Sequence, residues 1–339
     1  MEEAGRGAPQ AGPRAVDTVG ELGEVAVLDR VIPRLGPADA ALLGPGDDAA
    51  VVAAADGRYV VTTDLMVHGP DFRLAWSTPF ELGWKAAATN LTDVAAMGAR
   101  PTALVVAIAA PPETPVAVLE GIADGLREGL AVLAPGAGVV GGDLSASAVL
   151  TIAVTAFGDL EGRPPVLRSG ARPGDLVAHA GDRGLAAQGL ALLFAQATDA
   201  SGEPDASLAA ELRARHPLEV GAQLAPRPPV AAGVAAAVAG ATSMLDVSDG
   251  LARDALRVAR ASGAALDFDS TALGPDVRLA LAGGEDHGLL ATFPAGSTPP
   301  APFEVVGRVV EGAPAVLLDG VEVGADGWDP YSGWDGRAG

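Results

Sequence analysis

The chain has 339 residues, enough for two domains, and a formal charge of −21 from 43 acidic and 22 basic residues. Such an acidic protein repels nucleic acid and anionic membranes, and it has no apolar run of membrane-spanning length, so neither is an expected partner. The absence of cysteine excludes disulfides, thiolate metal sites and a cysteine nucleophile, and it favours a cytoplasmic location.

The first half of the chain alternates predicted strands and helices. Residues 1–19 lack an apolar signal core and are expected to be a disordered tail. The clearest helix begins at Thr78, where Thr78 and Glu81 form a capping box, and ends before Gly98. Strands are predicted at 49–53, 59–63, 102–110, 139–142 and 149–157, the first two joined by a turn at 55–58, and helices at 20–32, 78–97 and 114–134.

The turn-rich stretch 168–175 indicates a boundary, so an N-terminal domain at 20–165 and a C-terminal domain at 166–335 are expected. The polar, proline-rich stretch 200–230 has no assigned element. Ser248 and Asp249 are expected to cap a helix that Gly263 ends. Strands are predicted at 176–180, 304–309 and 315–318, and helices at 184–197, 230–239 and 249–262. This order of elements is typical of an α+β protein.

Aspartates recur in five short clusters with glycine, threonine or serine. They are Gly46-Asp47-Asp48, Thr62-Thr63-Asp64, Asn90-Leu91-Thr92-Asp93, Gly141-Gly142-Asp143 and Asp246-Val247-Ser248-Asp249-Gly250. If the clusters converge, they form a cage of carboxylates in which two charges about 4 Å apart repel by about 4 kcal/mol. Such a cage needs cations or protons. Ligands that are all oxygen favour magnesium, manganese or calcium.

The five clusters taken together favour phosphate chemistry, although no single cluster does so alone. The chain has no Gly-Lys-Ser/Thr phosphate loop, and Lys85 is its only lysine. Metals, arginines and backbone N–H groups must therefore neutralise a bound phosphate. Gly142 and Ser248 allow close backbone approach, the helix start at 249 offers free N–H groups, and Arg168 supplies a planar donor fork. Each cluster alone is more typical of a turn or cap, but the five together favour metal-assisted phosphoryl transfer.

The order of the motifs resembles the thiamine-monophosphate kinase family, within the superfamily of aminoimidazole ribonucleotide synthetase and selenophosphate synthetase. The matching stretches are these clusters together with Arg-Ser-Gly-Ala-Arg-Pro-Gly-Asp at 168–175 and Gly-Gly-Glu-Asp at 283–286. The resemblance covers residues 20–335. It implies a two-domain α+β fold of the synthetase type, whose N-terminal domain has a mixed or antiparallel sheet that forms a homodimer interface.

The resemblance also implies ATP-dependent phosphorylation of thiamine monophosphate to thiamine diphosphate with several Mg²⁺ ions. By motif, the metal ligands are Asp48, Thr62, Thr63, Asp64, Asp93, Asp143, Asp246 and Asp249; the ATP contacts are Gly142, Asp143, Arg168 and Ser248; and the thiamine contacts are Asp71, Glu285, Trp328 and Tyr331. Asp143, Asp249 and Arg168 would be the catalytic residues. No strong base is required, because a phosphate monoester with a second pKa near 6 is already largely ionised.

Three departures from the family pattern concern the substrate site. Asp71 stands where the family pattern has histidine, and His68 stands where it has an acidic residue; Pro330 likewise replaces a frequent histidine. Two alternatives stay open. One is another ATP-dependent enzyme of the superfamily, although a selenophosphate synthetase would need an N-terminal cysteine or selenocysteine. The other is an acidic cation-binding protein without turnover.

Overall fold

The computed structural model describes residues 17–45, 49–325 and 327. The elements of the N-terminal half are α1 (Val19–Val31), η1 (Ile32–Arg34), β1 (Ala41–Leu43), β2 (Val51–Val52), β3 (Val60–Val67), α2 (Pro79–Ala96), β4 (Arg100–Ala110), α3 (Val116–Leu133), β5 (Gly138–Ala146) and β6 (Thr151–Asp159). Those that follow are η2 (Arg168–Gly170), β7 (Leu176–Ala180), α4 (Leu185–Gln196), α5 (Ala206–Arg215), α6 (Pro217–Leu224), α7 (Val230–Val238), β8 (Ser243–Val247), α8 (Leu251–Ser262), β9 (Ala265–Phe268), η3 (Ser270–Ala272), α9 (Val277–Ala282), β10 (Gly288–Phe293), β11 (Glu304–Val310), β12 (Val316–Leu318) and β13 (Val321–Glu322).

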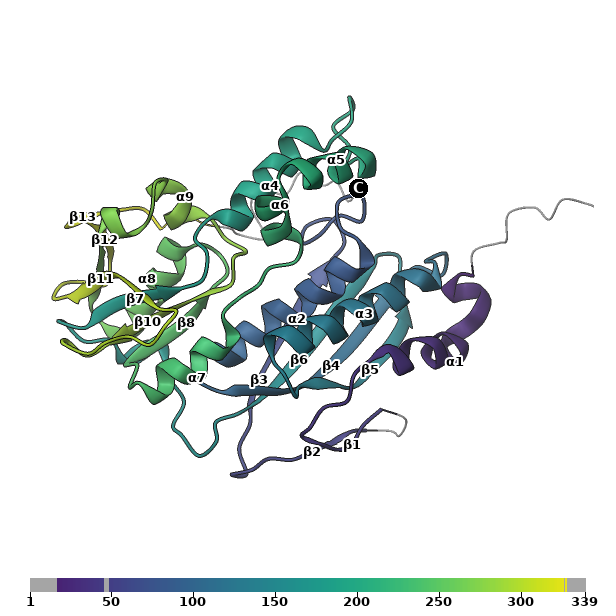
Figure 1. Ribbon diagram of the computed structural model, residues 1–339, viewed down its shortest axis with the longest axis horizontal. Helices are drawn as coiled ribbons and strands as arrows, with labels where there is room; N and C mark the ends of the chain where they lie inside the picture. Colours follow the sequence, from purple (N-terminus) through teal and green to yellow (C-terminus); the bar gives the residue numbers. More distant parts are fainter. Residues whose placement is uncertain (1–16, 46–48, 326, 328–339) are drawn as a thin grey trace, which may run out of the picture.

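The described strands form a two-stranded arm of β1 and β2 and two larger sheets (Figure 1). The four-stranded sheet has the order β3-β6-β4-β5, with β4 and β5 parallel and the other pairs antiparallel. The seven-stranded sheet has the order β13-β12-β9-β11-β7-β10-β8. The predicted α+β class with a mixed N-terminal sheet is therefore confirmed.

Helices α2 and α3 cover one face of the four-stranded sheet (Figure 1). Their backbones touch through glycines: a Cβ built on Gly83 would lie 1.9 Å from the carbonyl oxygen of Ile122, and one on Gly125 would lie 2.0 Å from that of Phe80. As predicted, Thr78 and Glu81 form the capping box of α2. Because α2 sits so deep, most of its residues are buried, and its outer side packs against α7 and β8.

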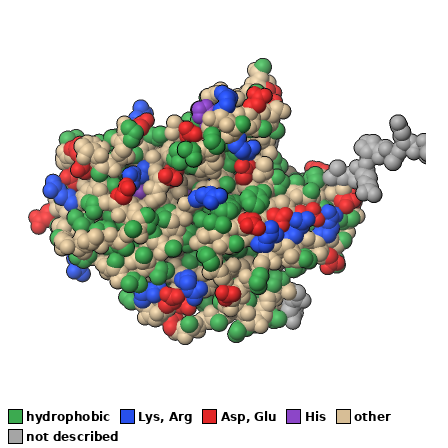
Figure 2. Space-filling model, viewed as in Figure 1, with side chains coloured by type: hydrophobic (Ala, Val, Ile, Leu, Met, Phe, Trp, Pro, Cys, Tyr) green, Lys and Arg blue, Asp and Glu red, His purple; other side chains and the backbone are tan. Residues whose placement is uncertain are grey.

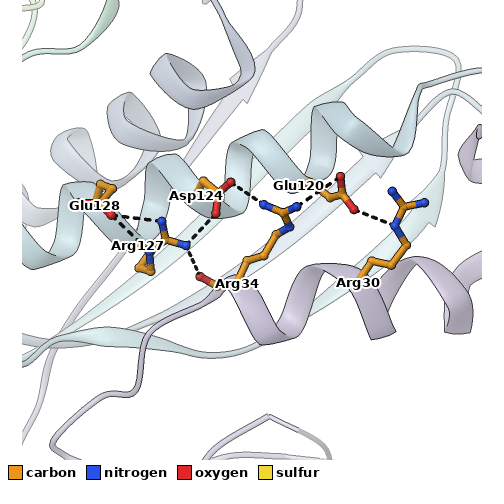
Figure 3. A network of polar contacts seen from close by, with 6 residues as sticks. All are labelled: Arg30, Arg34, Glu120, Asp124, Arg127 and Glu128. Carbon is orange, nitrogen blue, oxygen red and sulfur yellow. Dashed lines mark hydrogen bonds and ion pairs between the residues drawn. The ribbon is translucent and has the colours of Figure 1, made fainter. Parts of the chain in front are cut away.

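An ion-pair ladder joins α1 and η1 to α3 (Figure 3). Arg30 pairs with Glu120 at 2.7 Å, Arg34 pairs with Asp124 at 2.6 Å, and Arg127 pairs with Asp124 at 2.7 Å while donating to the carbonyl of Arg34. In the space-filling view the ladder is a stripe of alternating charge over α1 and α3 (Figure 2). Exposed pairs contribute at most about 1 kcal/mol each, so the ladder sets the position of α1 more than it stabilises the fold.

The seven-stranded sheet is covered on both faces. Helix α8 packs on one face around Leu245, Ala255 and Leu290, and α7 lies on the other, which continues into the core of the N-terminal half. Helices α4–α6 form a separate small bundle, closed by Trp76 from the N-terminal half. The loop 160–175 separates the two larger sheets. The predicted division near residue 165 stays a prediction, because the largest apolar cluster runs across it.

The predicted strands near 51 and 60 are present as β2 and β3, with a turn at 55–57 between them. Their partners lie elsewhere in the chain, because β2 pairs with β1 and β3 pairs with β6. Two other parts of the chain differ from the sequence interpretation. The stretch 200–230 contains α5 and α6, whose apolar residues pack on α4. Helix α8 has Gly250 as its N-cap, without a side-chain cap from Ser248 or Asp249.

The glycine contact predicts a matched pair of substitutions. Gly125→Ala should lower the free energy of unfolding by about 1–3 kcal/mol, because its methyl group cannot fit against the backbone of α2. Gly129→Ala, on the same helix, meets its nearest atom at 3.4 Å and should be neutral or stabilising by up to about 1 kcal/mol. Urea denaturation of both variants measures this. Equal effects of the two substitutions would contradict the packing argument.

Candidate active site between the two large sheets

Four of the predicted aspartates lie between the two large sheets. Asp64 comes from β3, Asp93 from α2, Asp246 from β8 and Asp249 from the turn before α8. The hydroxyl of Thr62 donates to Asp93 at 2.9 Å, which anchors that carboxyl to β3. The four carboxyls act on one another electrostatically: Asp64 feels the charges of Asp93 and Asp249, and Asp93 feels that of Asp246.

The pKa values of three of these carboxyls are raised. Burial, and then the charges of Asp93 and Asp249, raise the pKa of Asp64 to about 6. Burial and the charge of Asp246 raise the pKa of Asp93 to about 7, although Thr62 and Arg168 act in the opposite direction. Burial and the charge of Asp254 raise the pKa of Asp246 to about 6. The site therefore lacks positive charge, which a bound cation would supply.

The turn that carries Asp249 is held by a buried carboxylate that the sequence interpretation did not single out. Asp254 accepts hydrogen bonds from the backbone N–H groups of Ser248 and Asp249, both at 3.0 Å. Arg257 donates to both Asp254 and Asp249. The N–H groups expected to be free for phosphate at this helix start are thus already occupied. The sequence does contain a signal for this contact, because Asp254 lies in the first turn of α8, five residues after Asp249.

Asp143 and Thr63 lie apart from this group. By register, Asp143 shares a row with Ala107, Ala153 and Leu65, whereas Asp64 shares the next row with Val154. Adjacent rows point to opposite faces, so Asp143 faces the side of the sheet away from α2. It is also three strand spacings from β3, about 14 Å. Thr63 lies on that same side, where Thr155 donates to its hydroxyl at 3.1 Å.

The donor set fits magnesium held jointly with a nucleotide rather than an all-protein cage. Among the described residues, no group of three or more acidic or histidine side chains could by itself hold a metal ion. The predicted closed cage is therefore not formed by these residues. Magnesium commonly binds one or two carboxylates together with substrate phosphates, and the carboxylates with raised pKa values offer that kind of ligand. Asp64, Asp93, Asp246 and Asp249 would hold it.

Two cavities flank the carboxylates. The first, the Arg168 cavity, has about 780 Å³ and is lined by Thr62, Asp93, Arg168 and Asp246 together with apolar residues such as Met97. Gly142 and Asp143 instead line a different cavity of about 730 Å³ at the β5 edge of the sheet, which residues of α1, α3 and the β1–β2 arm also line. The predicted ATP contacts are therefore divided between separate cavities.

The second flanking cavity, the Lys85 cavity, has about 420 Å³ and combines charged and aromatic walls. Its polar lining includes Asp71, Lys85, Gln223 and Glu285, and its apolar wall includes Phe72, Trp76, Leu190, Leu193 and Phe194. Asp71 accepts a hydrogen bond from the backbone N–H of Val67 at 2.7 Å, which holds its carboxyl beside the end of β3. Lys85 and Gln223 were not predicted as site residues; a single lysine on a largely apolar helix was the signal for Lys85.

Three predicted site residues, Asp48, Trp328 and Tyr331, lie outside the described residues. Gly327, directly before Trp328, lines the Lys85 cavity and packs on the carbonyl of Asp249. His68, the other departure noted in the sequence, lies against Phe72 with ring centroids 5.5 Å apart and accepts the N–H of Leu74.

A curated relative, the thiamine-monophosphate kinase of Mycobacterium tuberculosis, is 44% identical over 332 residues, covering 94% of this chain and 92% of that protein. This chain belongs to the thiamine-monophosphate kinase family. The family enzyme of Corynebacterium glutamicum is 42% identical over 312 residues, covering 87% of this chain and 88% of that protein. Residues 46–160 also match the family model of the AIR synthase related protein, N-terminal domain.

Solved structures of the thiamine-monophosphate kinase family share the fold. The crystal structure of thiamine-monophosphate kinase from Stenotrophomonas maltophilia K279a has a TM-score of 0.72 and 30% sequence identity, covering 88% of this chain and 97% of that one. AaThiL complexed with AMPPCP and TMP has a TM-score of 0.69 and 29% identity, covering 91% and 97%. In the part of the chain described here, no helix is long and apolar enough to cross a membrane.

The raised pKa values predict how stability depends on pH without metal. The folded protein holds protons on these carboxyls more tightly than the unfolded chain, whose aspartates titrate near 3.8. This contribution to stability is complete below about pH 4 and is lost as the pH rises to about 7. Asp93→Asn should therefore flatten the fall in unfolding free energy between pH 4 and 7 and stabilise the metal-free protein above pH 7.

Urea denaturation in EDTA across this range measures the effect, with the exposed Glu311→Gln as control. A wild-type slope in Asp93→Asn would contradict the placement of Asp93 in the carboxylate group.

Proposed function

We propose that this chain transfers the γ-phosphoryl group of ATP to thiamine monophosphate, forming thiamine diphosphate and ADP. The observation that carries the proposal is the position of Asp64, Asp93, Asp246 and Asp249 between two cavities of different character. Related proteins of similar length bear the name of this activity, and AaThiL is the one complexed with AMPPCP and TMP.

The Arg168 cavity suits the phosphates of ATP. Arg168 presents a planar fork of donors, and its charge already acts on Asp93 and Asp246. Asp64, Asp93, Asp246 and Asp249 would hold magnesium ions, which would offset the charge that spreads over the transferring group. Asp249 and Arg168 are the proposed catalytic residues on this side. The proposed roles of Gly142, Ser248 and Asp143 toward ATP and metal rest on the resemblance of their motifs.

The Lys85 cavity suits thiamine monophosphate, which joins a cationic thiazolium ring to an anionic phosphate. Asp71 and Glu285 supply negative charge, and Phe72, Trp76 and Phe194 supply aromatic surface. Gly327 brings the chain to this wall just before Trp328, which supports substrate contacts from Trp328 and Tyr331. Asp71 lies in the cavity wall at the family's histidine position, so the departure from the pattern keeps a polar group there.

The chemistry needs positioning rather than a base. An oxygen of the acceptor phosphate forms the new bond to the γ-phosphorus as the bond to the bridging oxygen of ADP breaks. The acceptor oxygen is already ionised near neutral pH, so no proton has to be removed first. The carboxylates and Arg168 hold the two phosphates in line and stabilise the charge of the transition state.

We also propose a homodimer through the face of the four-stranded sheet opposite α2 and α3. Val61 and Leu65 on that face are 60% and 58% exposed, a high value for apolar residues in the middle of a strand. A second copy of the chain would cover them, and Asp143 would then lie at the interface. Use of ATP, an intracellular metabolite, together with the lack of cysteine supports a cytoplasmic location.

The proposed activity predicts ADP formation with ATP, Mg²⁺ and thiamine monophosphate, but not with thiamine as acceptor. A coupled assay measures both acceptors in parallel. Asp249→Asn should lower kcat at least about 100-fold, the usual scale for loss of one electrostatic contact to the transition state. Mg²⁺-dependent nucleotide binding without turnover on thiamine monophosphate would overturn the substrate assignment.

The proposed interface predicts that Leu65→Asp separates the dimer, because a buried unpaired carboxylate opposes association. Sedimentation velocity should give a monomer for this variant and a dimer for wild type. Leu218→Asp replaces an equally apolar residue, 74% exposed on α6, and should leave the dimer intact. A wild-type monomer at micromolar concentration would contradict the proposal.

A further inference from the structure

The only lysine of the chain is buried in the wall of the Lys85 cavity. Its side chain is 7% exposed, and its ammonium group forms an ion pair with Glu285, 200 residues further along the chain. Lysine is almost never buried without a partner, because removing its charge from water is costly. In the remaining positions the chain uses arginine as its strong base. The chain thus places its one ammonium side chain in the wall of a cavity.

The partner carboxylate belongs to a residue with an uncommon backbone conformation. Glu285 has a φ of +71°, so its backbone is in the left-handed region that side chains rarely adopt. Burial raises the pKa of Glu285, but the charge of Lys85 and the hydrogen bonds from Lys85 and Gln223 act against it, and the pKa lies below its usual value. Glu285 is therefore an anion that neutralises Lys85 while the cavity has no substrate.

Two other basic side chains lie near this pair, His287 and Arg73. Burial lowers the pKa of His287 to about 4, so its ring is neutral at physiological pH. Arg73, in the same cavity wall, has its guanidinium 4.7 Å from the centre of the Trp76 ring and 4.5 Å from that of Phe194. That stacking directs Arg73 toward the aromatic wall, whereas Lys85 faces Glu285.

The pair also lies next to the carboxylate group. The backbone N–H of Glu285 donates to the carbonyl of Ser248 at 2.8 Å, so the Glu285 loop packs directly on the turn that carries Asp249. A Cβ on Gly284 would lie 2.6 Å from that same carbonyl, which shows how closely the two loops approach. An anion bound by Lys85 is therefore held at the end of the cavity nearest to Asp249.

We propose that Lys85 binds the phosphate of the acceptor and so distinguishes thiamine monophosphate from thiamine. This inference rests on the proposed function. The incoming phosphate takes the ammonium group from Glu285, and the released carboxylate faces the cationic ring of the same substrate. Thiamine carries the ring but no phosphate, so it cannot replace Glu285 on Lys85.

Isothermal titration of the full-length protein without ATP tests the role of Lys85. Lys85→Met should weaken binding of thiamine monophosphate about 10- to 100-fold and change binding of thiamine less than about 3-fold, because only the phosphate contacts the ammonium group. Lys85→Arg should keep a preference for the monophosphate. Arg227→Met removes a charge that stacks on Trp84, beside Lys85 but outside the cavity lining, and should change neither affinity.

The double variant Lys85→Met with Glu285→Gln guards against unfolding, because it leaves no unpaired buried charge. It should weaken binding of the monophosphate at least about 10-fold more than binding of thiamine, which loses only the carboxylate of Glu285 near its ring, with Mg²⁺-ATP binding intact. Equal losses for both ligands, or no loss for either, would overturn the role of Lys85 alone. Wild-type protein that binds Mg²⁺-ATP but neither thiamine compound would overturn the proposed function as well.

Discussion

The close contact of α2 and α3 at Gly83 and Gly125 sets the depth at which α2 lies in the molecule. With glycine at both crossing points, the two backbones touch, and α2 becomes a helix that is buried on nearly every side. One side of it faces the four-stranded sheet, another faces α7 and β8. Asp93 and Lys85 can reach the space between the two large sheets only because the helix that carries them passes through it.

That position has an electrostatic cost. Asp93 and the buried Asp246 lie close enough to the more exposed Asp64 for the charges to act on one another, and all three carboxyls have raised pKa values. Few basic side chains of the chain lie near these carboxyls. Arg257 forms ion pairs with Asp249 and Asp254, and Arg168 lies in the wall of the Arg168 cavity. A site arranged in this way is unfavourable by itself. In the proposed function, cations that accompany a triphosphate would complete it, so metal binding would be coupled to nucleotide binding.

In the proposed function, one flanking cavity binds the donor and the other binds the acceptor, and different parts of the fold build them. The Arg168 cavity is built by β3, α2, β8 and the loop at η2, all of which belong to the main packing layers. Helices α4 and α6 supply part of the apolar wall of the Lys85 cavity. Two contacts join their bundle to the rest of the chain. Trp76 packs into it, and Asp286 accepts hydrogen bonds from the N–H groups of Gly184 and Ala186 at the start of α4. Substitutions in that bundle would therefore change which acceptor binds in the Lys85 cavity without moving Asp64, Asp93, Asp246 or Asp249.

The sequence by itself determined what depends on neighbouring residues and on the order of motifs. The capping box at Thr78, the apolar run of β4 and the α+β class all follow from local rules, and the motif order identified the family. Only the tertiary structure decided which distant groups meet. It pairs β2 with β1 and turns Asp143 to the opposite face from Asp64. It also joins Lys85 to Glu285, 200 residues further along the chain. Strand register and long-range ion pairs depend on packing between segments far apart in the chain, and no local pattern records that packing.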